Sequence, residues 1–262
     1  MTNPIFDLSS KVVLVTGAGS GMGRAICEAM AESGAHVAPV DINGKAVKET
    51  ADLISRYGGK VVPFTADAFD AADIKRVVDA TVEELGTIDV MFAHAAIVDT
   101  TPARVHETTI EDWDRIVSAY LRGLLLWMKS TFPIMMKKRK GSFVTTAAGT
   151  ALWPLPPVGN LHLATSYITG KTAGIMLTKL AARQYGEYGI RANVICPGYH
   201  RSLHHEANPA GLKEMEDFVL GVTPLKRVGV ASDIKGLAIY LASEASSFVT
   251  GQVFVEDGGF MA

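Results

Sequence analysis

Tyr167 and Lys171 are the residues of this sequence whose types and spacing are best suited to chemistry. Four residues apart, they lie on one face of a helix. An ammonium beside a phenol lowers the pKa of the phenol, so Tyr167 could exchange a proton nearer neutral pH. A Tyr and a Lys at this spacing occur on many helices, so the significance of the pair depends on its surroundings.

A glycine-rich turn follows a short apolar run at residues 12–15 and precedes a predicted helix. Glycine has no Cβ, so the turn can bend tightly and approach a ligand closely. The N–H groups that begin the helix suit a phosphate. The spacing Gly-x-x-x-Gly-x-Gly differs from the dinucleotide fingerprint, but the strand before it and the helix after it favour a dinucleotide site. We expect the turn to bind a cofactor through Gly17, Ser20, Gly21, Met22 and Gly23.

Two aspartates follow the next two predicted strands. Asp41 lies where a dinucleotide fold places the acid that binds the adenosine ribose. Its carboxylate would repel a 2′-phosphate and Ile42 follows it rather than a Lys or Arg, so we expect NAD rather than NADP. Asp67, with Ala68 beside it, could hold the adenine. The alternative is that each aspartate caps the helix after it.

These residues must be positioned by alternating strands and helices. Strands are predicted at residues 11–16, 35–40, 60–65, 88–93, 142–146, 190–195 and 252–255, with helices at 21–33, 45–57, 71–85, 110–137, 165–188, 211–220 and 231–242. The strands are apolar on both faces, which predicts one parallel sheet covered by helices on both sides. Such α/β sheets bind ligands beyond the carboxyl ends of their strands.

Composition restricts the class of protein. The chain has 262 residues, 48% of them hydrophobic, and a formal net charge of -2, which suits one domain with a large core. The charge balance favours neither nucleic acid nor an anionic membrane surface as a partner. Neither a signal peptide nor an apolar run of membrane-spanning length is evident. We expect a cytoplasmic protein with Cys27 and Cys196 as reduced core residues.

The whole pattern resembles the short-chain dehydrogenase/reductase family. The similar segments are Thr16–Gly23, Tyr167-x-x-x-Lys171, Arg191–Gly198 and Gly251–Gly259, and the resemblance extends in order over nearly the whole chain. It implies a single doubly wound Rossmann-type domain over residues 1–262, with seven parallel strands, a nicotinamide cofactor and, commonly, a homotetramer. It also implies that Tyr167 is the proton donor or acceptor, while Lys171 lowers its pKa and holds the nicotinamide ribose.

The resemblance further implies a substrate lid at about residues 198–222. The segment after Pro197 and Gly198 would touch the nicotinamide and close over the substrate. Additional cofactor contacts are expected from Ala95, Pro197, Gly198, His200 and Ser202.

Three positions depart from the family pattern. Ala93–Ala96 replaces Asn-Asn-Ala-Gly, Tyr120 stands where the family has a helix-borne Asn that feeds a proton relay, and Ala148 stands at the position of the usual Ser. Alanine cannot donate to a substrate carbonyl, and losing one such donor typically costs about 10²–10³ in rate. The candidates for a replacement are Thr146, Thr150 and His162, with His94 as another.

Five of the seven histidines are expected near one pocket, namely His94, His162, His200, His204 and His205. Proton transfer or anion binding suits them better than a metal, because no pair has the helical H-x-x-x-H spacing; they could equally be surface residues. The apolar loop Trp153–Leu163, with Tyr199 and Phe218, predicts a partly hydrophobic substrate pocket or packing within the protein.

Three functions agree with these residues. The leading one is an NAD-dependent alcohol dehydrogenase or carbonyl reductase acting on a small molecule. The second is a lyase, dehydratase or isomerase that uses bound NAD without net redox. The third is a cofactor-binding module without catalysis, against which the intact Tyr167 and Lys171 argue.

Overall fold

The computed structural model describes residues 4–97, 104–154, 164–201 and 209–262. Within these residues seven strands form one sheet in the order β3-β2-β1-β4-β5-β6-β7, and every registered pair is parallel. The strands are β1 Val12–Thr16, β2 His36–Asp41, β3 Phe64–Thr65, β4 Val90–Ala93, β5 Gly141–Thr146, β6 Ile190–Pro197 and β7 Val253–Glu256. The predicted doubly wound, Rossmann-type fold is confirmed.

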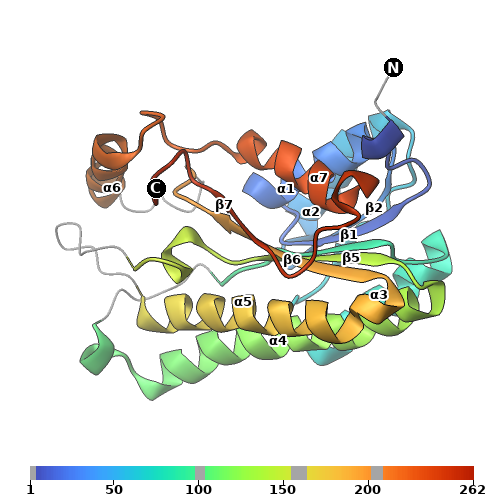
Figure 1. Cartoon of the computed structure of the whole chain (residues 1–262), viewed down its shortest axis with the longest axis horizontal. Helices are drawn as coiled ribbons and strands as arrows, with labels where there is room; N and C mark the ends of the chain where they lie inside the picture. Colours follow the sequence, from blue (N-terminus) through green and yellow to red (C-terminus); the bar gives the residue numbers. More distant parts are fainter. Residues whose placement is uncertain (1–3, 98–103, 155–163, 202–208) are drawn as a thin grey trace.

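Helices cover both faces of the sheet (Figure 1). On one face lie α1, α2 and α7, and on the other lie α3, α4 and α5. Their bounds are α1 Gly21–Glu32, α2 Gly44–Ile54, α3 Ala71–Leu85, α4 Ile110–Lys138, α5 Thr165–Tyr185, α6 Pro209–Val222 and α7 Lys235–Ala242. The sheet order reverses between β1 and β4, which is where such sheets bind ligands.

The core explains why β1 is apolar from Val12 to Val15. Val13 and Val15 pack into the cluster that contains Ile26 of α1, whereas Leu14 packs into the cluster that contains Trp127 of α4. Each strand residue points to the face opposite its neighbours, so a strand covered on both sides needs an apolar residue at every position.

Element ends follow local chemistry. The bounds predicted for α3 are those observed, because Asp70 accepts bonds from Ala72 N and Asp73 N, and Gly86 ends the helix at φ +86°. Of the third strand, predicted at residues 60–65, only Phe64–Thr65 is a strand, although Val61 forms an isolated parallel bridge with Val37. Pro63 just before the strand has no N–H for the ladder.

Three predicted helices change type near an end. The helix predicted at residues 45–57 ends as an α-helix at Ile54 and continues as the 3-10 turn Ser55–Tyr57. The helix predicted at residues 165–188 ends as an α-helix at Tyr185 and continues as the 3-10 turn Gly186–Tyr188. The helix predicted at 231–242 begins as the 3-10 turn Ala231–Ile234. Among the described residues no helix is both long and apolar enough to cross a membrane. Cys27 and Cys196 are buried free thiols, as predicted.

Candidate active site

The glycine turn lies against the segment that follows β4. Thr16 Oγ1 at the end of β1 accepts bonds from His94 N at 3.0 Å and Ala95 N at 3.1 Å. Gly17 has a φ of +69°, and a Cβ on it would lie 3.0 Å from Ala95 Cα. The fold therefore brings the ends of β1 and β4 together at the point where the strand order reverses.

The start of α1 also depends on glycine. A Cβ on Gly23 would lie 1.9 Å from Gly17 O, so no other residue fits without moving the turn. Ser20 is the N-cap residue, and its side chain makes no capping bond. The first N–H groups of α1, which include those of Gly21 and Met22, have no partner within the helix, and such an end can bind a phosphate.

Asp41 connects the glycine turn to the end of β2. Its Oδ2 accepts from Gly19 N at 2.8 Å and its Oδ1 accepts from Asn43 N at 2.9 Å. The cap of α2 is Asn43, whose side chain accepts from Ala46 N. The alternative that Asp41 is the helix cap is therefore wrong.

Asp67 and Ala68 lie after β3. Asp67 Oδ1 accepts from Phe69 N at 2.9 Å, and the cap of α3 is Asp70 rather than Asp67. Ala68 is buried, and its carbonyl accepts from Trp127 Nε1 at 2.9 Å. Helix capping therefore accounts for neither predicted aspartate.

Lys171 is buried in the middle of the site. Its Nζ donates to Thr146 O at 2.7 Å and lies 5.9 Å from the centre of the Tyr167 ring. Burial disfavours the charged form and lowers the pKa of Lys171 to about 8. The predicted pair is thus brought together at the carboxyl end of β5.

The phenol of Tyr167 does not have the lowered pKa that the sequence predicted. Burial, with a smaller contribution from Cys196, raises the pKa of Tyr167 to about 12. The expectation is wrong for the protein by itself, because burial disfavours the charged phenolate. Further positive charge beside the phenol would be needed to favour the phenolate.

His94 and Thr146 form a second polar pair. His94 Nδ1 lies 3.1 Å from Thr146 Oγ1, and Thr146 is buried. Burial, and then the charge of Lys171, lower the pKa of His94 to about 4, so its ring is neutral near pH 7. One of the candidate hydroxyls is therefore already engaged.

Ala148 is buried just before the 3-10 turn Gly149–Ala151, which carries the half-buried Thr150. Thr172 Oγ1 donates to Ala151 O at 2.9 Å and so connects this turn to α5. His162, the third predicted donor, lies outside the described residues.

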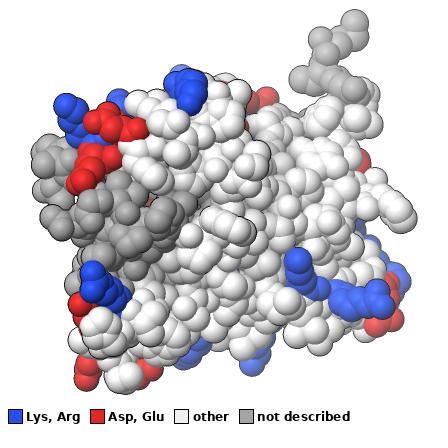
Figure 2. Space-filling view, turned by 60° about the vertical axis from the view of Figure 1, so that its left-hand side comes forward, with Lys and Arg blue, Asp and Glu red and all other residues white. Residues whose placement is uncertain are grey.

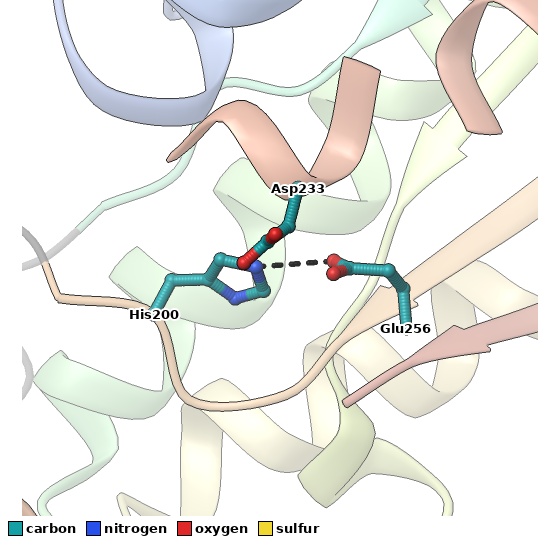
Figure 3. Close-up of side chains that lie close together, drawn as sticks. All are labelled: His200, Asp233 and Glu256. Carbon is teal, nitrogen blue, oxygen red and sulfur yellow. Dashed lines mark ion pairs between the residues drawn. The ribbon is translucent and has the colours of Figure 1, made fainter. Parts of the chain in front are cut away.

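The end of β6 leads directly to a buried histidine. Gly198 N donates to Glu256 O at 2.8 Å, which holds the residues after Pro197 against the end of β7. His200 has an exposed fraction of 7%; its Nδ1 lies 3.1 Å from Gly198 O and its Nε2 lies 3.1 Å from Glu256 Oε2. The side chain of His200 thus points toward Asp233 and Glu256 (Figure 3).

The two described histidines of the expected group have different partners, namely Thr146 for His94 and Glu256 for His200. His204, His205 and Ser202 lie outside the described residues, as does the part of the predicted lid at 202–208. The rest of the predicted lid is the chain from 198 to 201 and the helix α6.

His200, Asp233 and Glu256 offer ligand atoms within 4.8 Å of one another, a grouping that could hold a cation. However, Arg227 pairs with both oxygens of Asp233, at 2.6 and 2.8 Å. Burial lowers the pKa of His200, but Glu256, the Gly198 carbonyl and Asp233 outweigh it, and the net pKa is raised. We therefore interpret the group as an ion-pair network in which Glu256 and Asp233 favour the charged form of His200.

Tyr120 is the site residue whose role the sequence did not predict. The sequence marks its position only as an expected departure from the family pattern, yet its ring centre lies 4.6 Å from Lys171 Nζ. The available signal was the helical spacing of Ile116, Tyr120 and Leu124, which marks the buried face of α4.

Comparison with known proteins agrees with the fold. The family model described as Enoyl-(Acyl carrier protein) reductase matches residues 17–261. The 2-(R)-hydroxypropyl-CoM dehydrogenase of Xanthobacter autotrophicus is 32% identical, over 97% of this chain and 99% of the relative. The 2,5-dichloro-2,5-cyclohexadiene-1,4-diol dehydrogenase of Sphingobium indicum is 35% identical, over 98% and 99%.

Solved structures show the same likeness. A short-chain type dehydrogenase/reductase from Mycobacterium marinum has a TM-score of 0.87 and 30% identity, over 98% of each chain. A 7α-hydroxysteroid dehydrogenase in complex with NADH has a TM-score of 0.88 and 28% identity, over 99% and 98%. An NADPH-dependent 3-quinuclidinone reductase from Rhodotorula rubra has a TM-score of 0.88 and 26% identity, over 100% and 96%. The chain belongs to the short-chain dehydrogenase/reductase family and is an oxidoreductase that uses a nicotinamide cofactor.

The His200 network predicts a pH-dependent contribution to stability. Because the pKa of His200 is raised in the folded protein, its contribution is complete below the unfolded value of about 6.5 and is lost as pH rises through the folded value. In urea unfolding, His200→Gln should therefore be less stable than the wild type at pH 6, and the difference should shrink toward pH 9. The exposed His106 provides the control His106→Gln. A difference that stays constant with pH would contradict the interpretation.

Proposed function

We propose that this enzyme interconverts a secondary alcohol and a carbonyl with NAD(H), and that Tyr167 exchanges the hydroxyl proton. The observation that carries the proposal is the Tyr167 and Lys171 pair at the carboxyl edge of the sheet, the edge on which the glycine turn and Asp41 also lie. The named relatives are dehydrogenases and reductases, which favours net redox over a redox-neutral reaction.

The cofactor would lie across the ends of β1, β2 and β4. The proposed contacts, by element, are the turn at Gly17, Ser20, Gly21, Met22 and Gly23, then Asp41, Asp67, Ala68 and Ala95, and on the far side Tyr167, Lys171, Pro197, Gly198, His200 and Ser202. The main chain is the more plausible contact at His200, because its ring nitrogens face Gly198 O and Glu256. When bound, the nicotinamide supplies hydride acceptance or donation at its C4 atom.

Side chains of the protein itself would accept and donate the proton. In alcohol oxidation the carbinol carbon loses a hydride while its hydroxyl proton passes to the Tyr167 oxygen, so that a carbonyl forms. The Lys171 ammonium, fixed by Thr146 O at 2.7 Å, would favour the phenolate and hold ribose hydroxyls. The positive charge of an oxidised nicotinamide would add to it and oppose the burial that raises the pKa of Tyr167.

The substrate is proposed to be small and partly apolar. Figure 2 turns the side with the carboxyl ends of the strands forward, and the charged side chains seen there lie mostly toward its margins. Leu152 and Trp153 are exposed near the start of α5, and Phe218 of α6 packs against Phe260 with ring centres 6.1 Å apart. The rest of the predicted apolar loop, residues 155–163, lies outside the described part of the chain.

We also propose a homotetramer in the cytoplasm. Met176 and Leu180 of α5 and Leu125 of α4 are large apolar side chains exposed on neighbouring helices, and burial against a second copy would remove them from water. A native mass equal to one protomer would contradict this assembly.

The first test is alcohol oxidation by wild-type protein and Tyr167→Phe. With NAD⁺ and a panel of secondary alcohols, the wild type should produce NADH, and Tyr167→Phe should lower kcat/KM by about 10²–10⁴, the usual value of a positioned acid or base. Tyr185→Phe, at the other end of α5, is the matched control and should change little. A flat absorbance trace across the panel, with NADH shown to bind by fluorescence, would count against the proposal.

The second test concerns cofactor choice. Asp41→Asn keeps a carbonyl oxygen for Gly19 N but removes the negative charge, so the preference for NAD over NADP should fall by about 10- to 100-fold, the effect of losing one charged hydrogen bond. The ratio of kcat/KM values for the two cofactors measures it. Asp52→Asn, an exposed acid on α2, is the control. An unchanged ratio would mean that selectivity arises elsewhere.

The third test identifies the donor that replaces the usual Ser. Thr146, Thr150 and His94 are the described candidates, and we favour Thr150, because the Thr146 hydroxyl and His94 Nδ1 lie 3.1 Å from each other. Thr150→Val should reduce kcat by about 10²–10³, and adding Ala148→Ser should restore much of it. Thr169→Val, which removes an exposed hydroxyl from α5, is the control. Full activity of Thr150→Val would exclude Thr150 and direct attention to Thr146 and His162.

A further inference from the structure

Tyr120 occupies the space between two other aromatic side chains. It lies on the buried face of α4 with an exposed fraction of 7%. Its ring centre is 6.3 Å from that of Phe69 and 5.7 Å from that of Tyr167, and both contacts are edge-to-face. This geometry is a favourable one for aromatic pairs, so the ring of Tyr120 is held in one orientation.

Gly170 provides the room for this ring. It lies on α5 between Tyr167 and Lys171, and a Cβ on it would lie 3.0 Å from Tyr120 Cδ2. A side chain at position 170 would therefore press on the ring. The large residue at 120 and the smallest residue at 170 fit each other, which marks Tyr120 as an integral part of the site.

The face of the Tyr120 ring is directed at the Lys171 ammonium. Nζ lies 4.6 Å from the ring centre, within the range of a cation–π interaction. The other groups near this ammonium are the carbonyl of Thr146, the ring of Tyr167, the thiol of Cys196 and the neutral His94. Among the described residues no carboxylate forms an ion pair with Lys171, so the ring face is a main source of negative potential for this buried charge.

The hydroxyl of Tyr120 makes a different contact. It donates to Ile97 O at 2.9 Å and accepts from Ile97 N at 3.1 Å. Both groups belong to the segment after β4, in which Ala95 lies against Gly17. One side chain thus joins α4, the Lys171 ammonium and the wall of the proposed cofactor site.

We propose that Tyr120 is a positioning residue of the active site: its ring face holds the Lys171 ammonium beside Tyr167, and its hydroxyl fixes the segment after β4 at Ile97. The two functions are separable, because Tyr120→Phe keeps the ring and removes only the hydroxyl, whereas Tyr120→Leu removes both. The proposal rests on the proposed function for its catalytic consequence, but the state of Lys171 can be measured without turnover.

The test compares the two variants by pH profile and by direct titration. Losing an interaction with the charged form lowers the pKa of Lys171, so the alkaline limb of kcat/KM in Tyr120→Leu should move to lower pH by about half a unit to one unit. In Tyr120→Phe the limb should stay at the wild-type pH while KM for the cofactor rises. Lys171 Nζ can also be titrated by NMR in lysine-labelled protein, with its signal assigned by its loss in Lys171→Met. Without any substrate, the pKa of Lys171 should be lower in Tyr120→Leu than in Tyr120→Phe and the wild type.

Two controls keep the outcomes decisive. Ile116→Ala, one turn earlier on the buried face of α4, should lower stability without moving the alkaline limb. If Tyr120→Leu does not fold, Tyr120→Met replaces it, because an unbranched side chain fills irregular space without a ring face.

Equal pKa values of Lys171 in Tyr120→Phe and in Tyr120→Leu or Tyr120→Met would overturn the role proposed for the ring. An unchanged KM for the cofactor in Tyr120→Phe would overturn the role proposed for the hydroxyl. Absence of alcohol oxidation by the wild type would instead reject the proposed function and leave the NMR result standing.

Discussion

The burial of a single ammonium group is the constraint on which the site depends. Removing Lys171 from water lowers its pKa to about 8, so its charge near neutral pH has to be stabilised by the groups around it. The Thr146 carbonyl at 2.7 Å and the Tyr120 ring at 4.6 Å provide that stabilisation. The same burial raises the pKa of Tyr167 to about 12. In this buried site the neutral phenol of Tyr167 is therefore favoured over the phenolate unless further positive charge lies beside it.

The sheet explains how distant parts of the sequence meet around this charge. All of its registered strand pairs are parallel, so the carboxyl ends of β1, β4, β5 and β6 lie along one edge. Thr16 then bonds the residues after β4, and Lys171 bonds the last residue of β5. The backbone segments can approach each other closely at this edge because Gly17 and Gly23 have no Cβ. A Cβ on Gly23 would lie 1.9 Å from Gly17 O.

The fold could be predicted from the sequence because it is encoded in local residue patterns, namely apolar runs and the residues that begin and end helices. Parallel strands covered on both faces are continuous apolar runs, and the ends of α3 were predicted at Ala71 and Leu85 because Asp70 and Gly86 are strong signals. The prediction failed at β3, where Pro63 limits the ladder, and for the pKa of Tyr167, which burial determines. It also could not pair His200 with Glu256, because that contact joins residues 56 positions apart in the chain through tertiary structure alone.

Two positions that the sequence analysis expects to depart from the family pattern, those of His94 and Tyr120, both lie near Lys171. His94, at one of these positions, bonds the side chain of Thr146, and the main chain of the same residue accepts from Lys171. Tyr120, at another, places its ring over that ammonium in room left by Gly170. His94 and Tyr120 therefore both contribute to the surroundings of the Lys171 ammonium. A buried ammonium held in this way near Tyr167 suits proton transfer, which favours a catalytic site over a scaffold that only binds a cofactor.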